Sequence, residues 1–172
     1  MKYTSALLLA VGAANAKHDH KINIDFNNFF ESKNLVQSLI ESAQQVTDTP
    51  GHVTFEQCDD DAKIFNLDLS STNTTPNPIT KGDDITFNLI GVVNSQMTLK
   101  NVHIHVEWNS SPLYDEDNPG SSVYDSDVQY NLGWNVPSFA PSGHYDVTVT
   151  GTGDASSVTD GKVMCIKAYM DL

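Results

Sequence analysis

Arginine is absent from this chain of 172 residues, and lysine is scarce. Nine basic side chains stand against 22 acidic ones, which gives a formal net charge of −13 at neutral pH. Nucleic-acid binding needs cations that neutralise phosphates, and arginine is the side chain that binds a phosphate in a planar, bidentate way. The composition therefore excludes nucleic acid as a partner, and it argues against tight recognition of a phosphate head group.

Long apolar runs are also absent, apart from a short one near the N-terminus. Lys2 precedes an apolar run from Ala6 to Ala14, and Ala14-Asn15-Ala16 fits the small-residue rule for signal cleavage. The run is too short to span a bilayer. We expect a signal peptide over residues 1–16 and a protein that is secreted or lies in the endosomal or lysosomal lumen. A buried N-terminal helix is the alternative.

Cysteine occurs only twice, as Cys58 and Cys165. In an oxidising compartment two such cysteines usually form a disulfide. We expect this pairing, which would connect the start of a domain to its end. Two free, buried thiols are the alternative.

Two sequences match the acceptor motif for N-glycosylation, Asn73-Thr74-Thr75 and Asn109-Ser110-Ser111. Because a match shows only that the motif is present, Asn73 and Asn109 are candidates for modification. Occupied sites would make the protein a glycoprotein.

Catalytic motifs are missing. The chain has no Gly-x-Ser-x-Gly, no glycine-rich phosphate loop and no His-Glu-x-x-His. His18 and His20 are expected in a mobile tail. His103-x-His105 places two imidazoles on one strand face, where a solvated polar face is favoured over a metal site. We expect neither an enzyme nor a bound metal.

The acidic stretch 115–120 begins like a calcium-binding EF-hand loop. Pro119, however, occupies a ligand position, and Ser126 replaces the closing glutamate. A solvated loop is therefore favoured over a weak calcium site.

The periodicity of apolar residues divides the mature chain in two. Residues 17–52 form an N-terminal extension, in which an apolar face with 3.6-residue spacing predicts an amphipathic helix over 27–47. From residue 53 onward the period is two, and turn clusters separate short alternating runs. This pattern predicts an all-β antiparallel sandwich over 53–172. The alternation assigns these residues to its interior: Phe87, Leu89, Val102, Ile104, Val106, Trp108, Val147 and Val149.

Several landmarks occur in order along 53–172, and together they resemble a known family. They are Val53-Thr54-Phe55-Glu56-Gln57-Cys58, Pro76-Asn77-Pro78, Lys81-Gly82-Asp83-Asp84-Ile85-Thr86-Phe87, Pro137 followed by Pro141-Ser142-Gly143-His144-Tyr145-Asp146-Val147, and Gly161-Lys162-Val163-Met164-Cys165. The ordered set resembles the ML lipid-recognition domain. This family includes the Niemann–Pick lysosomal sterol-transfer protein, the group 2 mite allergens and phosphatidylinositol–phosphatidylglycerol transfer proteins.

The resemblance implies an immunoglobulin-like sandwich of about seven strands that holds a lipid, a sterol or a phospholipid, between its sheets. It also implies that Cys58–Cys165 joins the first and last strands, and that Phe139 and Pro141 lie near the cavity mouth. Lipid transport then needs no cofactor other than the bound lipid. One departure is that the stretch 124–133 lacks the additional cysteine common in the family, so looser middle strands are expected.

Other functions stay open at this point. The predicted helix is a lid over the cavity, a membrane-docking element, a plain structural helix or a propeptide. Transient contact with a membrane or a protein would accompany lipid exchange. The chain is alternatively an extracellular recognition module with a closed core, which binds protein or glycan through loops such as 110–127. A third function is an assembly subunit that holds a partner with the helix.

Overall fold

The computed structural model describes residues 19–24, 51–58 and 64–172. These residues form ten β-strands and no helix, so none of the described segments is a helix that could cross a membrane. The strands are β1 (Asp19–Ile24), β2 (Thr54–Gln57), β3 (Phe65–Leu67), β4 (Asn73–Thr75), β5 (Asp84–Val93), β6 (Met97–Trp108), β7 (Ser111–Tyr124), β8 (Asp127–Asn135), β9 (His144–Ala155) and β10 (Val158–Asp171).

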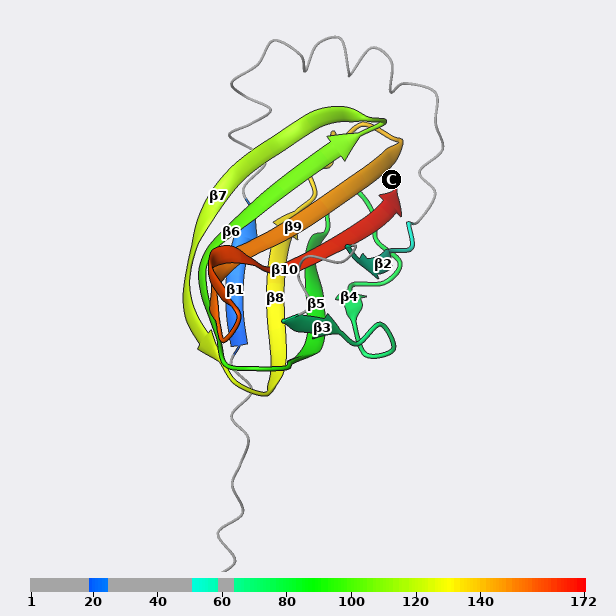
Figure 1. The fold of residues 1–172 in the computed structure, drawn as a ribbon. Coiled ribbons are helices and arrows are strands. Elements are labelled where there is room, and N and C mark those ends of the chain that lie inside the picture. The colour runs from blue at the N-terminus through cyan, green and yellow to red at the C-terminus, as the bar shows by residue number, and fades with distance from the viewer. Residues whose placement is uncertain (1–18, 25–50, 59–63) are drawn as a thin grey trace, which may run out of the picture.

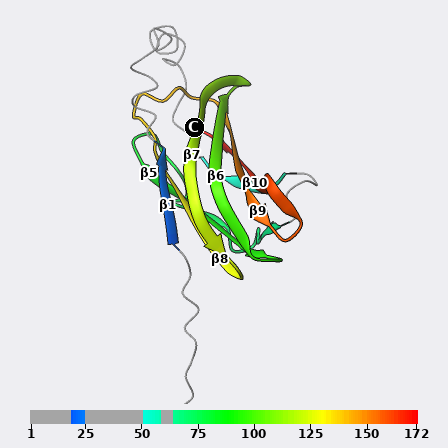
Figure 2. The same ribbon diagram turned by 60° about the vertical axis from the view of Figure 1, so that its left-hand side comes forward.

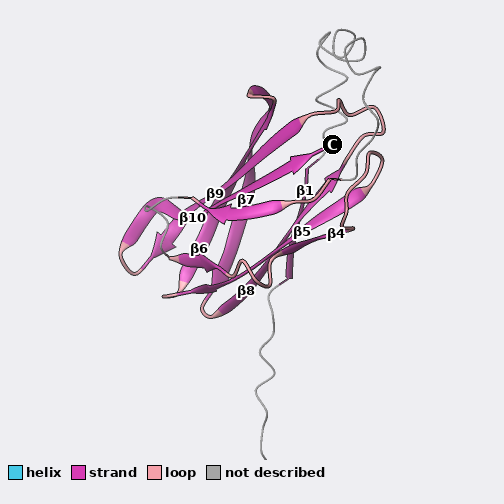
Figure 3. Ribbon diagram, turned by 90° about the vertical axis from the view of Figure 1, so that its right-hand side faces the viewer, coloured by secondary structure: helices cyan, strands magenta, loops and turns pink. Residues whose placement is uncertain are grey.

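The strands form two five-stranded sheets (Figure 1). The first sheet has the order β1-β8-β5-β3, with β4 also paired to β5, and the second has the order β2-β10-β9-β6-β7. Figure 3 shows β5 and β8 in one layer and β9 and β10 in the other. The predicted all-β sandwich is confirmed, with ten described strands instead of about seven.

One additional strand, β1, comes from the segment assigned to the N-terminal extension. Its backbone pairs in parallel with β8, from Asp19 opposite Gln129 to Ile24 opposite Trp134. His20 therefore lies in a strand and not in a tail. The alternation of Lys21-Ile22-Asn23-Ile24 is typical of a strand. The predicted signal peptide and the predicted helix over 27–47 lie outside the described residues, and the domain limits stay predictions.

Another additional strand, β7, occupies the stretch 115–120, where a solvated loop was predicted, and most of 110–127, which was expected to be a loop. It pairs with β6 along its whole length and forms the edge of the second sheet. Its sequence has few strand-forming residues. An edge strand needs hydrogen-bonded partners on one side only, and Pro112 and Pro119 are therefore tolerated in β7. The acidic residues that suggested a calcium loop are thus part of a sheet edge.

The Gln57 side chain joins the two sheets along β2 and β3, and a disulfide lies beside it within the second sheet. Gln57 on β2 donates from Nε2 to the Phe65 carbonyl over 2.7 Å, and its Oε1 accepts from the Leu67 amide over 2.9 Å. These two bonds join the edge strands of the two sheets. Next to them, Cys58 and Cys165 form the predicted disulfide, with 5.3 Å between their Cα atoms. β1 and β7 lie on the opposite side of the sandwich (Figures 1 and 2).

Candidate functional site

The two sheets face each other with apolar side chains. Alternate residues along β5, β6, β8 and β9 are buried, as the period-two pattern predicts. A register shift between Leu99 and Asn101 on β6 keeps both Leu99 and Val102 on the buried face. Seven of the residues predicted to line the interior are buried: Phe87, Leu89, Val102, Ile104, Val106, Val147 and Val149.

Aromatic rings connect the two sheets in the interior. Phe55 of the second sheet meets Phe87 of the first edge to face, with 6.2 Å between the ring centroids. The ring centroid of Trp134 in the first sheet lies 5.8 Å from that of Tyr145 in the second. The Trp134 ring also stacks on the Phe87 ring, with 6.4 Å between the centroids. The sheets are therefore packed against each other at this aromatic cluster.

The remaining predicted lining residues lie at the ends of the strands or outside them. Trp108 is half-buried, and its Nε1 donates to the Ser142 carbonyl over 3.2 Å. Pro141 is buried and its carbonyl accepts from the Tyr145 hydroxyl over 2.6 Å, whereas the Phe139 side chain is 47% exposed. Phe139 thus lies on the surface of the β8–β9 connection. Its role at a cavity mouth stays a prediction.

The interior becomes polar along β7. The strand register places Tyr114, Glu116 and Asn118 opposite the inward residues of β6, so their side chains share the inward face. The Tyr114 hydroxyl donates to the Glu116 carboxylate over 3.1 Å, and Glu116 is exposed at this edge. Sequence reasoning missed this polar rim, since nothing in the apolar pattern of 111–124 marks a strand.

Tyr130 on β8 is a second inward residue that sequence reasoning missed. It is buried in the alternating series Val128, Tyr130, Leu132 and Trp134. The signal was present in the sequence, because these residues alternate with Gln129, Asn131, Gly133 and Asn135.

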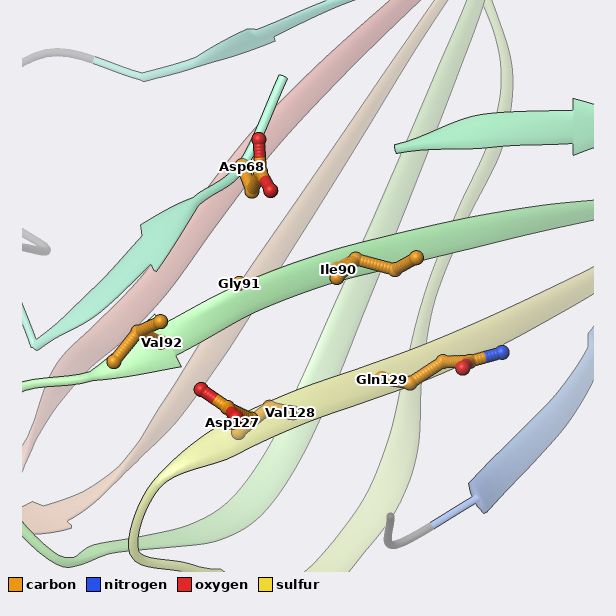
Figure 4. A pocket seen from close by; sticks show the side chains of 7 residues that line it. All are labelled: Asp68, Ile90, Gly91, Val92, Asp127, Val128 and Gln129. Carbon is orange, nitrogen blue, oxygen red and sulfur yellow. The ribbon is translucent and has the colours of Figure 1, made fainter. Parts of the chain in front are cut away.

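A groove of about 240 Å³ lies outside the sandwich, over β5 and β8 (Figure 4). Its lining includes Ile90 and Val92 of β5 and the carboxylates Asp68 and Asp127. Ser70 and Ser71 hydroxyls donate to Asp68 over 2.6 and 2.7 Å, and these bonds lower the pKa of that carboxyl. The Asp68 carboxylate is thus held by its own loop, and Asp127 and Gln129 are the other polar residues of the groove.

The outer face of the second sheet carries a row of histidines and carboxylates. Asp115 of β7 lies 3.1 Å from His103 Nε2 and 3.0 Å from His105 Nδ1 of β6. Asp117 accepts a hydrogen bond from Asn101 Nδ2 over 2.7 Å and lies 3.1 Å from His103 Nδ1, and these two bonds, the first more than the second, lower the pKa of Asp117. The predicted polar face at His103 and His105 is confirmed. Among the described residues, no cluster of three or more metal-ligating side chains is placed to hold an ion.

His144 on the same face lies between two carboxylates. Its Nδ1 is 2.8 Å from Asp171 and its Nε2 is 3.3 Å from Asp146. The hydrogen bond to Asp171 is the main cause of a raised pKa of His144, and Asp146 adds to it. The charged imidazole is thus favoured in the folded state.

The variant His144→Gln tests this arrangement through pH. Because the folded-state pKa of His144 is above its ordinary value of 6.5, its stabilisation is complete below pH 6.5 and is lost as the pH rises through the folded-state pKa. We expect the difference in Tm between the native protein and the variant to be larger at pH 5.5 than at pH 8.5. The control is an NMR titration of the imidazole, and a midpoint at or below 6.5 would contradict the prediction.

Both glycosylation candidates are exposed. Asn73 Nδ2 donates to the Ser71 carbonyl over 2.9 Å at the start of β4. Asn109 lies in the turn between β6 and β7 with a φ of 46°, and its Oδ1 accepts from the His144 amide over 3.0 Å. Either side chain is reachable from solvent, and occupancy stays a prediction.

Comparison with known proteins gives no match to any protein-family model and no significant match among curated proteins. Among solved structures, that of chicken MD-1 complexed with lipid IVa is similar to this chain. The similarity covers 73% of this chain and 93% of the MD-1 chain, with 11% sequence identity and a TM-score of 0.42. These values do not assign the chain to a family.

Proposed function

We propose that this chain is a non-enzymatic lipid carrier of the ML type, which holds the apolar part of a sterol or a phospholipid between its two sheets. Residues of β5, β6, β8 and β9 would contact the hydrocarbon. Exchange with a membrane or a partner protein would take place at the side of β1 and β7. The reaction breaks no bond, so the chain needs no catalytic group.

The observation that carries this proposal is the composition of the interior. Among the described side chains, the inward faces of β5, β6, β8 and β9 are mainly apolar, and the edge strand β7 adds the polar residues Tyr114, Glu116 and Asn118. An apolar site with a few polar groups at one edge is typical of pockets that bind small amphipathic molecules. On the opposite side, Gln57 joins β2 to β3, and the disulfide holds the end of β2 to β10 within the second sheet.

Burial of hydrocarbon supplies enough free energy for such a function. Each CH₂ group removed from water contributes about 0.8 kcal/mol, so a long acyl chain gains on the order of 10 kcal/mol before the costs of ordering are subtracted. The proposed setting is the secretory pathway or the endosomal or lysosomal lumen, after removal of residues 1–16. A disulfide between Cys58 and Cys165 is stable in those compartments.

A second function follows from the depth of burial. The inward side chains of β5 and β6 are almost fully buried, between 0 and 5% exposed. Side chains this deeply covered also fit a closed core, and the chain would then be an extracellular recognition or assembly module for protein or glycan. In that case the binding surface would be the polar edge strand β7, because residues 111–124 form a strand in place of the expected binding loop.

Extraction of the natively purified, mature protein tests the two functions. Organic extraction followed by lipid mass spectrometry should give one lipid class at near-stoichiometric amount. A blank extract, repeated after incubation with vesicles that contain sterol and phospholipid, would contradict the carrier function and favour the closed core.

A matched pair of variants then locates the lipid. Val149→Phe adds volume to the inward face of β9, whereas Val92→Phe adds the same volume to the exposed face of β5. We expect Val149→Phe to reduce the bound lipid several-fold, because a larger side chain competes with the ligand for space. Val92→Phe should bind as much lipid as the native protein. Equal amounts of lipid in two folded variants would contradict a site between the sheets.

A further inference from the structure

Two buried tyrosines in the interior differ in what their hydroxyl groups contact. Tyr145 on β9 is 1% exposed, and its hydroxyl donates to the Pro141 carbonyl over 2.6 Å. Tyr130 on β8 is 2% exposed, and its hydroxyl has no hydrogen-bond partner among the described residues. A buried polar group without a partner is unfavourable and rare in folded proteins, so it calls for an explanation.

The ring of Tyr130 lies among apolar side chains of β5 and β8. Leu89 lies opposite it on β5, and Val128 and Leu132 flank it on the same face of β8. Burial raises the pKa of Tyr130, and the neighbouring Tyr124 adds to this, so the phenol stays protonated and able to donate. On β7, Nδ2 of Asn118 is likewise buried without a partner in the described part of the chain.

Charged side chains are missing from the inward positions of the strands whose side chains the structure describes, other than the edge strand β7. The inward positions of β5, β6, β8, β9 and β10 carry no lysine, and Lys100 and Lys167 lie on the surface next to carboxylates. A carboxylate or a phosphate buried among these strands would find no cationic side chain of the described residues as a counter-ion, which makes its transfer from water strongly unfavourable. A neutral oxygen needs only a hydrogen-bond donor or acceptor, and a phenol supplies both.

We propose that the Tyr130 hydroxyl is the polar contact of the interior and selects neutral lipids whose apolar body carries a hydroxyl or carbonyl oxygen. This inference rests on the proposed lipid-carrier function and narrows its ligand class. The two sources of such an oxygen are the hydroxyl of a sterol and the ester carbonyl of an acylated glycerol.

The variant Tyr130→Phe removes the hydroxyl and keeps the ring. Three fluorescent probes separate the chemistries: dehydroergosterol carries a hydroxyl, a pyrene-labelled diacylglycerol carries ester carbonyls, and diphenylhexatriene is a hydrocarbon. We expect the variant to bind at least one oxygen-bearing probe about 10-fold more weakly, as the loss of one buried hydrogen bond predicts, and to bind diphenylhexatriene with unchanged affinity. The probe that weakens identifies the source of the oxygen.

Thermal stability of the lipid-free protein supplies an independent measurement. Tyr130→Phe should leave Tm unchanged or raise it, since it removes an unpaired polar group, whereas Tyr145→Phe should lower Tm because it leaves the Pro141 carbonyl without its donor. A fall in Tm for Tyr130→Phe, or unchanged affinity for both oxygen-bearing probes, would overturn the inference. If the native protein binds diphenylhexatriene while Tyr130→Phe changes nothing, only the inference fails. If the native protein binds none of the probes and its organic extract also contains no lipid after incubation with phospholipid vesicles, the lipid-carrier function itself fails.

Discussion

Replacement of both cysteines by alanine is expected to lower the free energy of unfolding by about 4–5 kcal/mol. The disulfide between Cys58 and Cys165 closes a loop with a sequence separation of 107 residues. In the chain-entropy treatment, a cross-link stabilises mainly by restricting the unfolded chain, and a loop of about 100 residues corresponds to about 4.7 kcal/mol. Total stabilities of single domains are about 5–15 kcal/mol, so the loss would be a large fraction of the whole.

Equilibrium unfolding in urea measures this loss. The native protein in the presence of a reductant is the control, and it should unfold at the same urea concentration as Cys58→Ala/Cys165→Ala. Gln57 keeps its two bonds to β3 in both cases, so the native topology of β2 is retained. A loss below about 1 kcal/mol would show that the bonds of Gln57, together with the pairing of β2 and β10, already restrict this end of the chain.

Strands with an apolar alternation could be predicted from the sequence, and those without one could not. The runs at Ile85-Thr86-Phe87-Asn88-Leu89 and at Val102 to Trp108 lie within β5 and β6 because one face of each strand is buried. β7 has no such alternation, since its inward positions Tyr114, Glu116 and Asn118 are polar. β3 and β4 have three residues each, which is too short for a period to be visible.

The apolar part of the candidate site was predictable for the same reason, and the polar part was not. Burial requires apolar residues at regular spacing, so Phe87, Val106 and Val149 could be assigned to the interior from the sequence. The role proposed for Tyr130 depends on a different property: its hydroxyl has no hydrogen-bond partner among the described residues, and hydrogen-bond partners can be read only from coordinates. The same holds on the outer face, where the contact of Asp115 with two histidines of β6 depends on the register of β7.

Phe87→Ala is expected to cost about 3–5 kcal/mol of unfolding free energy, the usual range for the loss of a buried aromatic ring. Phe87 is 1% exposed, and its ring contacts Phe55 across the sandwich and Trp134 within its own sheet. Removal of the ring therefore loses both a contact within a sheet and a contact between the sheets. Val92→Ala on the same strand is the matched control, because its side chain is 46% exposed and should change stability by less than about 0.5 kcal/mol.

The size of the Phe87 effect bears directly on what the interior is for. A cost of 3–5 kcal/mol in the lipid-free protein means that the rings of Phe87 and Phe55 form a packed contact that holds the sheets together at the aromatic cluster. A ligand would then lie farther along the strands, toward Leu89 and Tyr130 on one sheet and Val149 on the other. A cost below about 1 kcal/mol would mean that the space around Phe87 is already loosely filled without lipid. In that case lipid should raise the free energy of unfolding of the native protein more than that of Phe87→Ala. Unfolding at a series of lipid concentrations measures this difference.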